Sequence, residues 1–193
     1  DVQRTSDEVL ICFHDKIFQK RPISNFTFKE LKSQLGEHNI ELCSFVEYLS
    51  LYENIKLDIE LKEAGYESQI LDLLKDIPID RYVMKSFEIE TLREIRKLSP
   101  HIHIGYLLSK EQWFSRFPSI KKQAYPFKDN QINETILSDV QDWFQTLQNE
   151  LSLQFLSPDI SIVDPVFILG AQNIGMEVWP WTVRTKKDLK RMA

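Results

Sequence analysis

Cysteine, glycine and proline are scarce in this sequence, and long apolar segments are missing. The 193 residues include two cysteines, five glycines and eight prolines. Cys12 and Cys43 cannot form the disulfide framework of a small secreted domain, and we expect two buried thiols. The low glycine and proline content excludes a fibrous or low-complexity chain. No apolar run reaches the roughly 18 residues that span a bilayer, so the sequence predicts no membrane segment.

The charge balance is mildly acidic. With 24 basic and 29 acidic residues the formal net charge is −5, which argues against a protein that binds nucleic acid through phosphate attraction. Hydrophobic residues make up 42% and charged residues 27%, the composition of a soluble globular protein of one domain or two small ones. The low cysteine content and the lack of a signal-peptide pattern favour a cytoplasmic protein.

The two ends of the sequence indicate a piece of a longer protein. Residue 1 is Asp rather than Met, and the first residues already have the pattern of folded sequence. Residues 190–193 stop part-way through a helical pattern. We therefore expect further residues on both sides of this chain.

Strand-like and helix-like segments alternate along the chain, which predicts an α/β protein with a mostly parallel sheet. Residues 55–62 alternate between apolar and charged side chains, the period of a strand, and Thr27 with Glu30 has capping-box spacing. Both an open doubly wound sheet and a (β/α)₈ barrel fit, and we expect an irregular insertion around residues 109–150. The predicted strands are 9–13, 55–62, 82–84, 103–108, 153–156 and 177–183, and the predicted helices are 27–35, 67–76, 89–98, 135–151 and 164–175.

Glu60 and Lys62 are candidate site residues because they end the strongest predicted strand. In parallel α/β folds the site lies at the carboxyl ends of the strands, and side chains two apart share a face. A carboxylate and an ammonium there could hold a divalent cation and a phosphate. An amphipathic strand with its charged face in water is the alternative. A strand covered on both faces is normally apolar, so the charges favour a polar interior such as a barrel mouth.

Other chemically useful side chains also follow or end predicted strands. His14 comes directly after the 9–13 strand, where an imidazole could transfer protons near neutral pH. From the residues alone, an ordinary loop without chemistry is the favoured interpretation of the His14-Asp15 pair. Phe87 follows the 82–84 strand, Trp181 lies in the last predicted strand, and Asp1 begins the chain.

Four motifs occur in an order and at spacings that resemble the glycerophosphodiester phosphodiesterase family. Residues 1–15 resemble its D-V-x-x-T-x-D-G…H-D stretch, and residues 59–62 resemble its I-E-I/L-K strand. Residues 86–87 resemble its S-F strand end, and residues 181–183 resemble the start of its W-T-V-N motif. The ordered set covers nearly the whole chain.

This resemblance implies a TIM-type (β/α)₈ barrel that hydrolyses glycerophosphodiesters to glycerol 3-phosphate and an alcohol. It implies one divalent cation, Mg²⁺ or Ca²⁺, with Asp1 and Glu60 among the metal ligands. His14 would be a catalytic general acid or base. Lys62 would neutralise phosphate charge, and Phe87 and Trp181 would pack against the glycerol end. The implied partner is a small-molecule glycerophosphodiester.

The sequence also departs from the family pattern. Glu8 stands where T-x-D-G has glycine, and Arg184 stands where W-T-V-N has asparagine. The family's first-strand histidine and the first glutamate of its Glu-x-Asp pair would precede Asp1, and its last strand would follow Ala193. The resemblance thus implies that residues 1–193 form one partial domain, an incomplete barrel without its first and last strands. We expect this segment alone to be inactive.

Two alternatives stay open at this point. A phospholipase D-like barrel acting on lysolipids or sphingolipids shares the cation and the two-histidine chemistry. A non-catalytic barrel relative acting as a binding module would share only the fold. Cyclic phosphate products would favour the first alternative, and an upstream sequence without the second histidine would favour the other.

Overall fold

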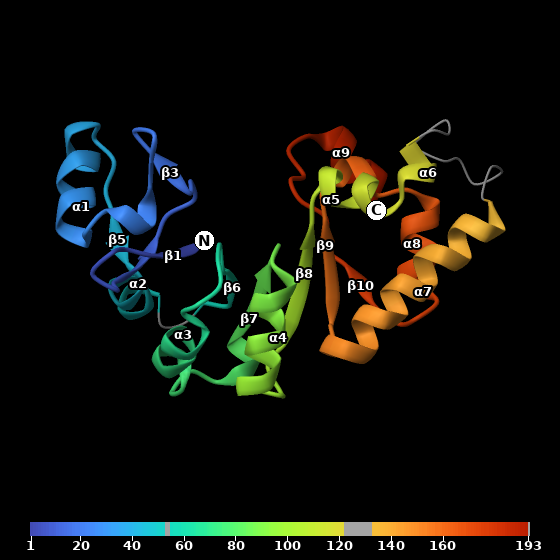
Figure 1. Cartoon of the computed structure of the whole chain (residues 1–193), viewed down its shortest axis with the longest axis horizontal. Helices are drawn as coiled ribbons and strands as arrows, with labels where there is room; N and C mark the ends of the chain where they lie inside the picture. The colour runs from blue at the N-terminus through green and yellow to red at the C-terminus, as the bar shows by residue number, and fades with distance from the viewer. Residues whose placement is uncertain (53–54, 122–132, 193) are drawn as a thin grey trace. The chain divides into compact units, whose positions relative to one another are not determined.

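The computed structural model describes residues 1–52, 55–121 and 133–192 of the chain. These residues divide into two compact units, residues 1–103 and 104–193, which run from blue to green and from green to red in Figure 1. The expectation of one partial domain with an insertion around residues 109–150 stays a prediction. Within the described ranges, no helix is both long enough and apolar enough to cross a membrane.

The first unit opens with antiparallel strands. β1 (Val2–Arg4) pairs with β2 (Leu10–Cys12), and β2 pairs with β5 (Cys43–Ser44), giving the order β1-β2-β5. A second hairpin joins β3 (Ile17–Phe18) to β4 (Arg21–Pro22). The expectation that every strand is followed by a helix was therefore wrong at this end. β1 has only three residues, two of them polar, and its strand conformation comes from pairing rather than from a local pattern.

The turn between β1 and β2 holds Glu8 in the left-handed backbone region, with φ of +63°. Thr5 closes this turn, because its Oγ1 donates to Asp7 Oδ1 at 2.6 Å and accepts from the Val9 N–H at 3.1 Å. The same Thr5 hydrogen bond is the main cause that lowers the pKa of Asp7. Residues other than glycine adopt the left-handed region at a cost of about 1 kcal/mol. The left-handed backbone at this position explains why the T-x-D-G pattern has glycine there. Glu8 adopts the same conformation at the cost of about 1 kcal/mol.

Glu8→Gly is therefore expected to raise the free energy of unfolding by up to about 1 kcal/mol. Urea unfolding monitored by circular dichroism measures the change. Glu37→Gly is the matched control, since Glu37 is an exposed residue of a helix, where glycine costs about 1 kcal/mol. A Glu8→Gly variant that loses as much stability as Glu37→Gly would contradict the strain assigned to this turn.

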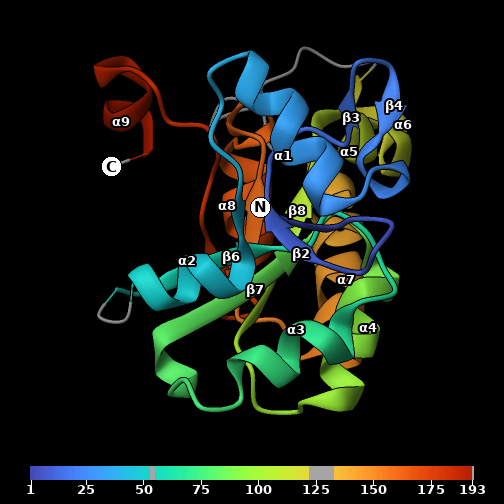
Figure 2. The ribbon, with the colours of Figure 1, turned by 90° about the vertical axis from the view of Figure 1, so that its left-hand side faces the viewer.

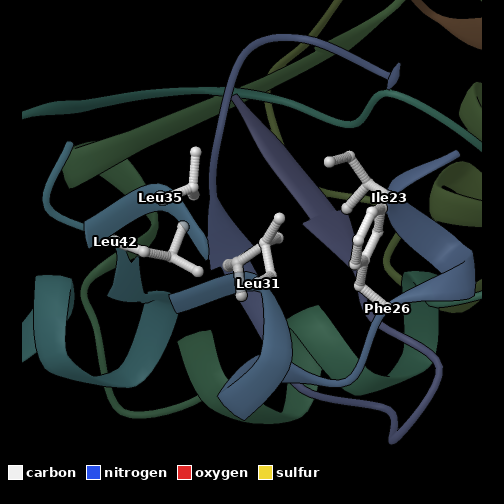
Figure 3. Packing of buried hydrophobic residues seen from close by; sticks show 6 residues of the cluster. Ile23, Phe26, Leu31, Leu35 and Leu42 are labelled. Carbon is white, nitrogen blue, oxygen red and sulfur yellow. The ribbon is translucent and has the colours of Figure 1, made fainter. Parts of the chain in front are cut away.

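A hydrophobic core forms between β2 and the segment that follows it. α1 (Phe28–Glu37) begins at Thr27 with the predicted capping box to Glu30. α2 (Phe45–Leu51) begins at Ser44 with a second capping box, to Glu47. Figure 3 shows the buried side chains of this core, among them Leu31 and Leu35 of α1. The buried cluster consists of Ile11, Ile23, Phe26, Leu31, Leu35 and Leu42, and Phe13 packs against it.

The rest of the first unit is a parallel βαβ arrangement, as predicted. β6 (Leu57–Glu60) pairs in parallel with β7 (Tyr82–Ser86), and each strand is followed by a helix, α3 (Glu67–Leu74) and α4 (Ile89–Leu98). The two helices lie side by side in Figure 2. Just beyond β6, Leu61 forms a parallel bridge with Val2. This bridge places the antiparallel hairpin at the carboxyl end of β6.

The second unit also contains parallel strands. β9 (Phe155–Pro158) lies between β8 (Ile104–Leu108) and β10 (Glu177–Val178). β10 is shorter than the predicted strand 177–183, because the chain meets Pro180, which has no N–H for a ladder bond. α7 and α8 lie side by side (Figure 1). The helices are α5 (Lys110–Arg116), α6 (Pro118–Lys121), α7 (Glu134–Leu151), α8 (Pro165–Gln172) and α9 (Lys186–Met192).

Gly105 on β8 leaves space for the ring of Phe155 on β9, and that ring stacks on Trp179. Gly105 and Phe155 are register partners on these strands. A Cβ atom on Gly105 would lie 2.1 Å from Cε2 of Phe155. The Phe155 ring in turn stacks on Trp179, with ring centroids 4.0 Å apart and planes 15° apart. The missing side chain at position 105 is therefore the space that the phenyl ring occupies.

Candidate active site

Four of the five sequence candidates in the first unit line one open pocket of about 370 Å³: His14, Glu60, Lys62 and Phe87. This volume lies at the lower end of the range for small-molecule sites. The lining residues come from the segments that follow β2, β6 and β7, so the pocket lies where these strands end. They are His14, Asp15, Lys16, Ile17, Glu60, Lys62 and Phe87.

Lys62 lines this pocket and lies between two carboxylates, that of Glu60, which also lines the pocket, and that of Asp1, which does not. Its Nζ is 2.7 Å from Glu60 Oε1 and 3.0 Å from Asp1 Oδ1. The Lys62 side chain is 9% exposed and that of Glu60 12% exposed, so water screens this cluster far less than a surface ion pair. The structure thus brings Asp1, Glu60 and Lys62 together, which the sequence predicted only for the last two from their spacing.

Tyr66 fixes the backbone beneath this charged cluster. Its buried hydroxyl donates to the Val2 carbonyl at 2.6 Å and accepts from the Lys62 N–H at 3.1 Å. Burial raises the pKa of Tyr66 well above its usual value, so the hydroxyl keeps the proton that it donates. Sequence reasoning missed this residue, because its role depends on β1 lying beside β6.

Of the four charged residues in the 55–62 segment, the first two are exposed to solvent and the last two are buried at the pocket. Lys56 is exposed, and Asp58 forms an ion pair with Lys85 at 2.6 Å. Glu60 and Lys62 instead point into the pocket floor. The alternative of a fully solvated charged face therefore fails for the last two charged positions of this segment.

His14 lies at the rim of the pocket with one ring nitrogen already engaged. Its Nδ1 is 2.7 Å from Asp15 Oδ1, and both side chains are largely exposed. With Nδ1–H donating to the carboxylate, Nε2 is the nitrogen that remains to exchange a proton with a bound molecule. Asp15 thus has an orienting position that the adjacent pair in the sequence did not by itself indicate.

Phe87 forms an apolar wall at the end of β7. It follows Ser86, whose buried hydroxyl donates to the Leu61 carbonyl at 2.8 Å and accepts from the Glu88 N–H at 3.1 Å. Ser86 therefore ties the end of β7 to the end of β6. Glu88 is the residue directly before α4. Ile17, 60% exposed, also lines the pocket.

Trp181 belongs to the second unit. Its Nε1–H donates to the Ser157 carbonyl at 2.8 Å, and its N–H donates to the Pro158 carbonyl at 2.9 Å. The half-buried indole thus lies at the carboxyl end of β9. Arg184, at the position of the family's asparagine, is exposed.

The two cysteines are neighbours on the first sheet. Cys12 and Cys43 are register partners on β2 and β5, and both are free, half-buried thiols. Burial is the main cause that raises the pKa of Cys12 to about 11. Cys12 is therefore a neutral thiol at physiological pH and is a poor candidate for a nucleophile.

The Glu60 and Asp1 carboxylates beside Lys62 fit a hard divalent cation. Glu60 Oε1 is buried and, although it contacts the Lys62 ammonium, it accepts no hydrogen bond in the structure. Asp1 Oδ1 approaches the same ammonium, so two carboxylate oxygens converge on one point. Carboxylate oxygens are the ligands that Mg²⁺ and Ca²⁺ prefer. Within residues 1–52, 55–121 and 133–192 no group of three His, Cys, Asp or Glu side chains forms a complete metal site.

Solved structures of other proteins share this fold. The chain is 15% identical to a putative glycerophosphoryl diester phosphodiesterase from Agrobacterium tumefaciens, with a TM-score of 0.74 over 98% of this chain and 74% of that one. It is 19% identical to a phosphodiesterase from Oleispira antarctica, determined with the product sn-glycerol-3-phosphate, with a TM-score of 0.71 over 99% and 74%. The TIM-barrel fold expected from the motifs is thereby confirmed.

Sequence comparison leads to the same group of proteins. The chain is 24% identical over 212 residues to a glycerophosphodiester phosphodiesterase from Caldanaerobacter subterraneus subsp. tengcongensis, covering 100% of this chain and 75% of that protein. The model of the glycerophosphoryl diester phosphodiesterase family matches residues 1–193. Enzymes of that family generally depend on a divalent metal. The chain therefore belongs to the glycerophosphoryl diester phosphodiesterase family.

Proposed function

We propose that this protein hydrolyses glycerophosphodiesters to glycerol 3-phosphate and an alcohol at the pocket of the first unit. The observation that carries the proposal is the convergence of Asp1, Glu60 and Lys62 beside His14. Charge-stabilising groups and a proton-transfer group are the two requirements for cleaving a phosphate diester.

The pocket floor would bind the phosphate. The Lys62 ammonium lines this pocket, and it would neutralise one negative charge of the diester. Asp1 and Glu60 would hold one divalent cation, Mg²⁺ or Ca²⁺, which when bound withdraws charge from the phosphoryl oxygens. With the cation present, Lys62 would be free to turn from the carboxylates toward the phosphate.

His14 would move a proton during the cleavage. Hydrolysis forms a bond from the oxygen of water to phosphorus, breaks the bond to one ester oxygen, and transfers a proton to that oxygen. Nε2 of His14 would act as a general acid or base for one of these proton transfers, with Asp15 keeping the ring oriented. The family resemblance assigns the complementary transfer to a second histidine that precedes residue 1.

Phe87 would contribute apolar surface to the glycerol end of the substrate. Phe87 already lines the pocket. The same role that the family resemblance implies for Trp181 stays a prediction.

His14→Ala in the full-length protein is expected to lower kcat for glycerophosphocholine hydrolysis by about a hundredfold to ten-thousandfold, the usual share of a general acid or base. The assay measures released sn-glycerol-3-phosphate in the presence of Mg²⁺ or Ca²⁺. His101→Ala is the matched control, because His101 is exposed and does not line the pocket.

Full activity of His14→Ala would overturn the assigned role of His14. Formation of a cyclic phosphate from a lysolipid, without release of sn-glycerol-3-phosphate, would instead favour the phospholipase D-like alternative. Absence of hydrolysis in the wild-type protein with either cation would favour the binding module.

A further inference from the structure

Gln3 is a buried polar side chain next to the pocket, and the chemistry above does not use it. It lies in the middle of β1, opposite Ile11 of β2, and is 2% exposed. A buried amide is costly unless its polar atoms are hydrogen-bonded. The partners of this amide therefore show what the residue does.

Two hydrogen bonds of the Gln3 side chain go to the backbone on either side of His14. Its Nε2 donates to the Phe13 carbonyl at 2.7 Å and to the Asp15 carbonyl at 3.0 Å. One NH₂ group thus holds residues 13 and 15 in place at the same time. Two fixed carbonyls set the direction of the peptide units before and after residue 14, and hence the direction in which its side chain leaves the chain.

Other contacts hold the two ends of this loop. Phe13 packs against the hydrophobic cluster, and its N–H donates to the Asp1 carbonyl at 3.2 Å. The side chains of His14 and Asp15 are largely exposed and contact each other. Beyond them, the Ile23 N–H donates to the Lys16 carbonyl at 3.0 Å. The two bonds from Gln3 are the contacts that lie directly on either side of His14, at the carbonyls of residues 13 and 15.

We propose that Gln3 is a positioning residue that holds the His14 loop so that the imidazole faces the pocket. The role rests on the proposed function of His14, because Gln3 acts on the reaction only through that side chain. A proton-transfer group must be held within a few tenths of an ångström of its productive geometry, and a looser group lowers the rate without weakening ground-state binding.

Gln3→Met tests this role, because methionine has nearly the same length but no donor. We expect kcat for glycerophosphocholine to fall by about tenfold to a hundredfold while KM changes by less than about threefold. The phosphate-binding groups stay in place in this variant, which is why KM is preserved. The freed carbonyls of Phe13 and Asp15 lie near the surface and can be hydrated, so the fold is expected to survive.

Gln69→Met is the matched control. Gln69 also donates from Nε2 to a backbone carbonyl, that of Glu8, at 2.7 Å, but it lies on α3 and does not line the pocket. Its kcat and KM are expected to equal those of the wild type. A loss of kcat in both variants would assign the effect to general loss of structure and overturn the proposal.

A double variant separates positioning from stability. In a His14→Ala background, Gln3→Met is expected to cause no further loss of kcat, since the group that it positions is gone. A further tenfold loss there would overturn the proposal. Amide hydrogen exchange at residues 14 and 15 is expected to accelerate in Gln3→Met alone, a readout that needs no activity.

The two possible failures are distinguishable. An active His14→Ala protein overturns the proton-transfer role of His14, and the positioning role falls with it. An inactive His14→Ala protein beside a fully active Gln3→Met protein overturns only the role of Gln3.

Discussion

Glu60→Gln is expected to lower glycerophosphodiester hydrolysis by about a hundredfold to a thousandfold. The substitution keeps the size of the side chain and removes the charge of one of the two carboxylates that contact Lys62. The remaining carboxylate, Asp1, is expected to bind a divalent cation much more weakly alone. Steady-state assays at increasing Mg²⁺ and Ca²⁺ concentrations measure the loss and show whether more cation restores the rate.

A second measurement on the same variant does not depend on turnover. A cation that binds only the folded protein raises the melting temperature in proportion to the logarithm of its concentration. We expect this shift in the wild-type protein and a much smaller shift in Glu60→Gln.

Asp58→Asn is the matched control for Glu60→Gln. Asp58 lies two residues earlier on β6, but it is exposed and pairs with Lys85 rather than Lys62. An exposed ion pair contributes about 1 kcal/mol at most, so this variant should keep its activity and its cation response. Equal activity of Glu60→Gln and Asp58→Asn would show that Glu60 is not a ligand of a required cation.

Gly105→Ala is expected to destabilise the second unit by about 2–3 kcal/mol, in the upper range for overpacking a core. The new methyl group would overlap the ring of Phe155, which is 1% exposed and stacked on Trp179. The ring cannot move away without breaking that stack. Urea unfolding, followed by the fluorescence of the tryptophans, measures the change.

Gly36→Ala is the control for this substitution. Gly36 lies in α1, and a Cβ atom there would have no neighbour within 4 Å. Alanine in a helix is favoured over glycine by about 1 kcal/mol, so this variant is expected to be more stable than the wild type. The opposite signs of the two variants are the expected result, and a Gly105→Ala protein as stable as the wild type would disprove the assigned overlap.

Local patterns were enough to predict most of the helices and parallel strands. The Thr27–Glu30 spacing predicted the start of α1, and the alternation in residues 55–62 predicted β6. In both cases the signal lies within a few consecutive residues, as capping and period-two burial require. The prediction of the 135–151 helix is confirmed for the same reason by α7, which begins one residue earlier.

The arrangement of the hairpin could not be predicted in this way. β1 contains Val2, Gln3 and Arg4, which have no distinctive pattern, and its partner is chosen by long-range pairing. The same limit applies to the site. The spacing of Glu60 and Lys62 predicted a shared face, whereas the contact of Asp1 with Lys62 and the bonds of Gln3 depend on where β1 lies.

The β1–β2 hairpin has a thermodynamic consequence for the site. It carries Asp1 at one end and leads to His14 at the other, and Gln3 and the Val2 carbonyl bind it to the His14 loop and to Tyr66. One local opening of this hairpin therefore displaces Asp1 and His14, the proposed proton-transfer group, in the same event. The fraction of molecules with a competent site equals the fraction in which the hairpin is closed, so the site is assembled and lost cooperatively even while the rest of the protein stays folded.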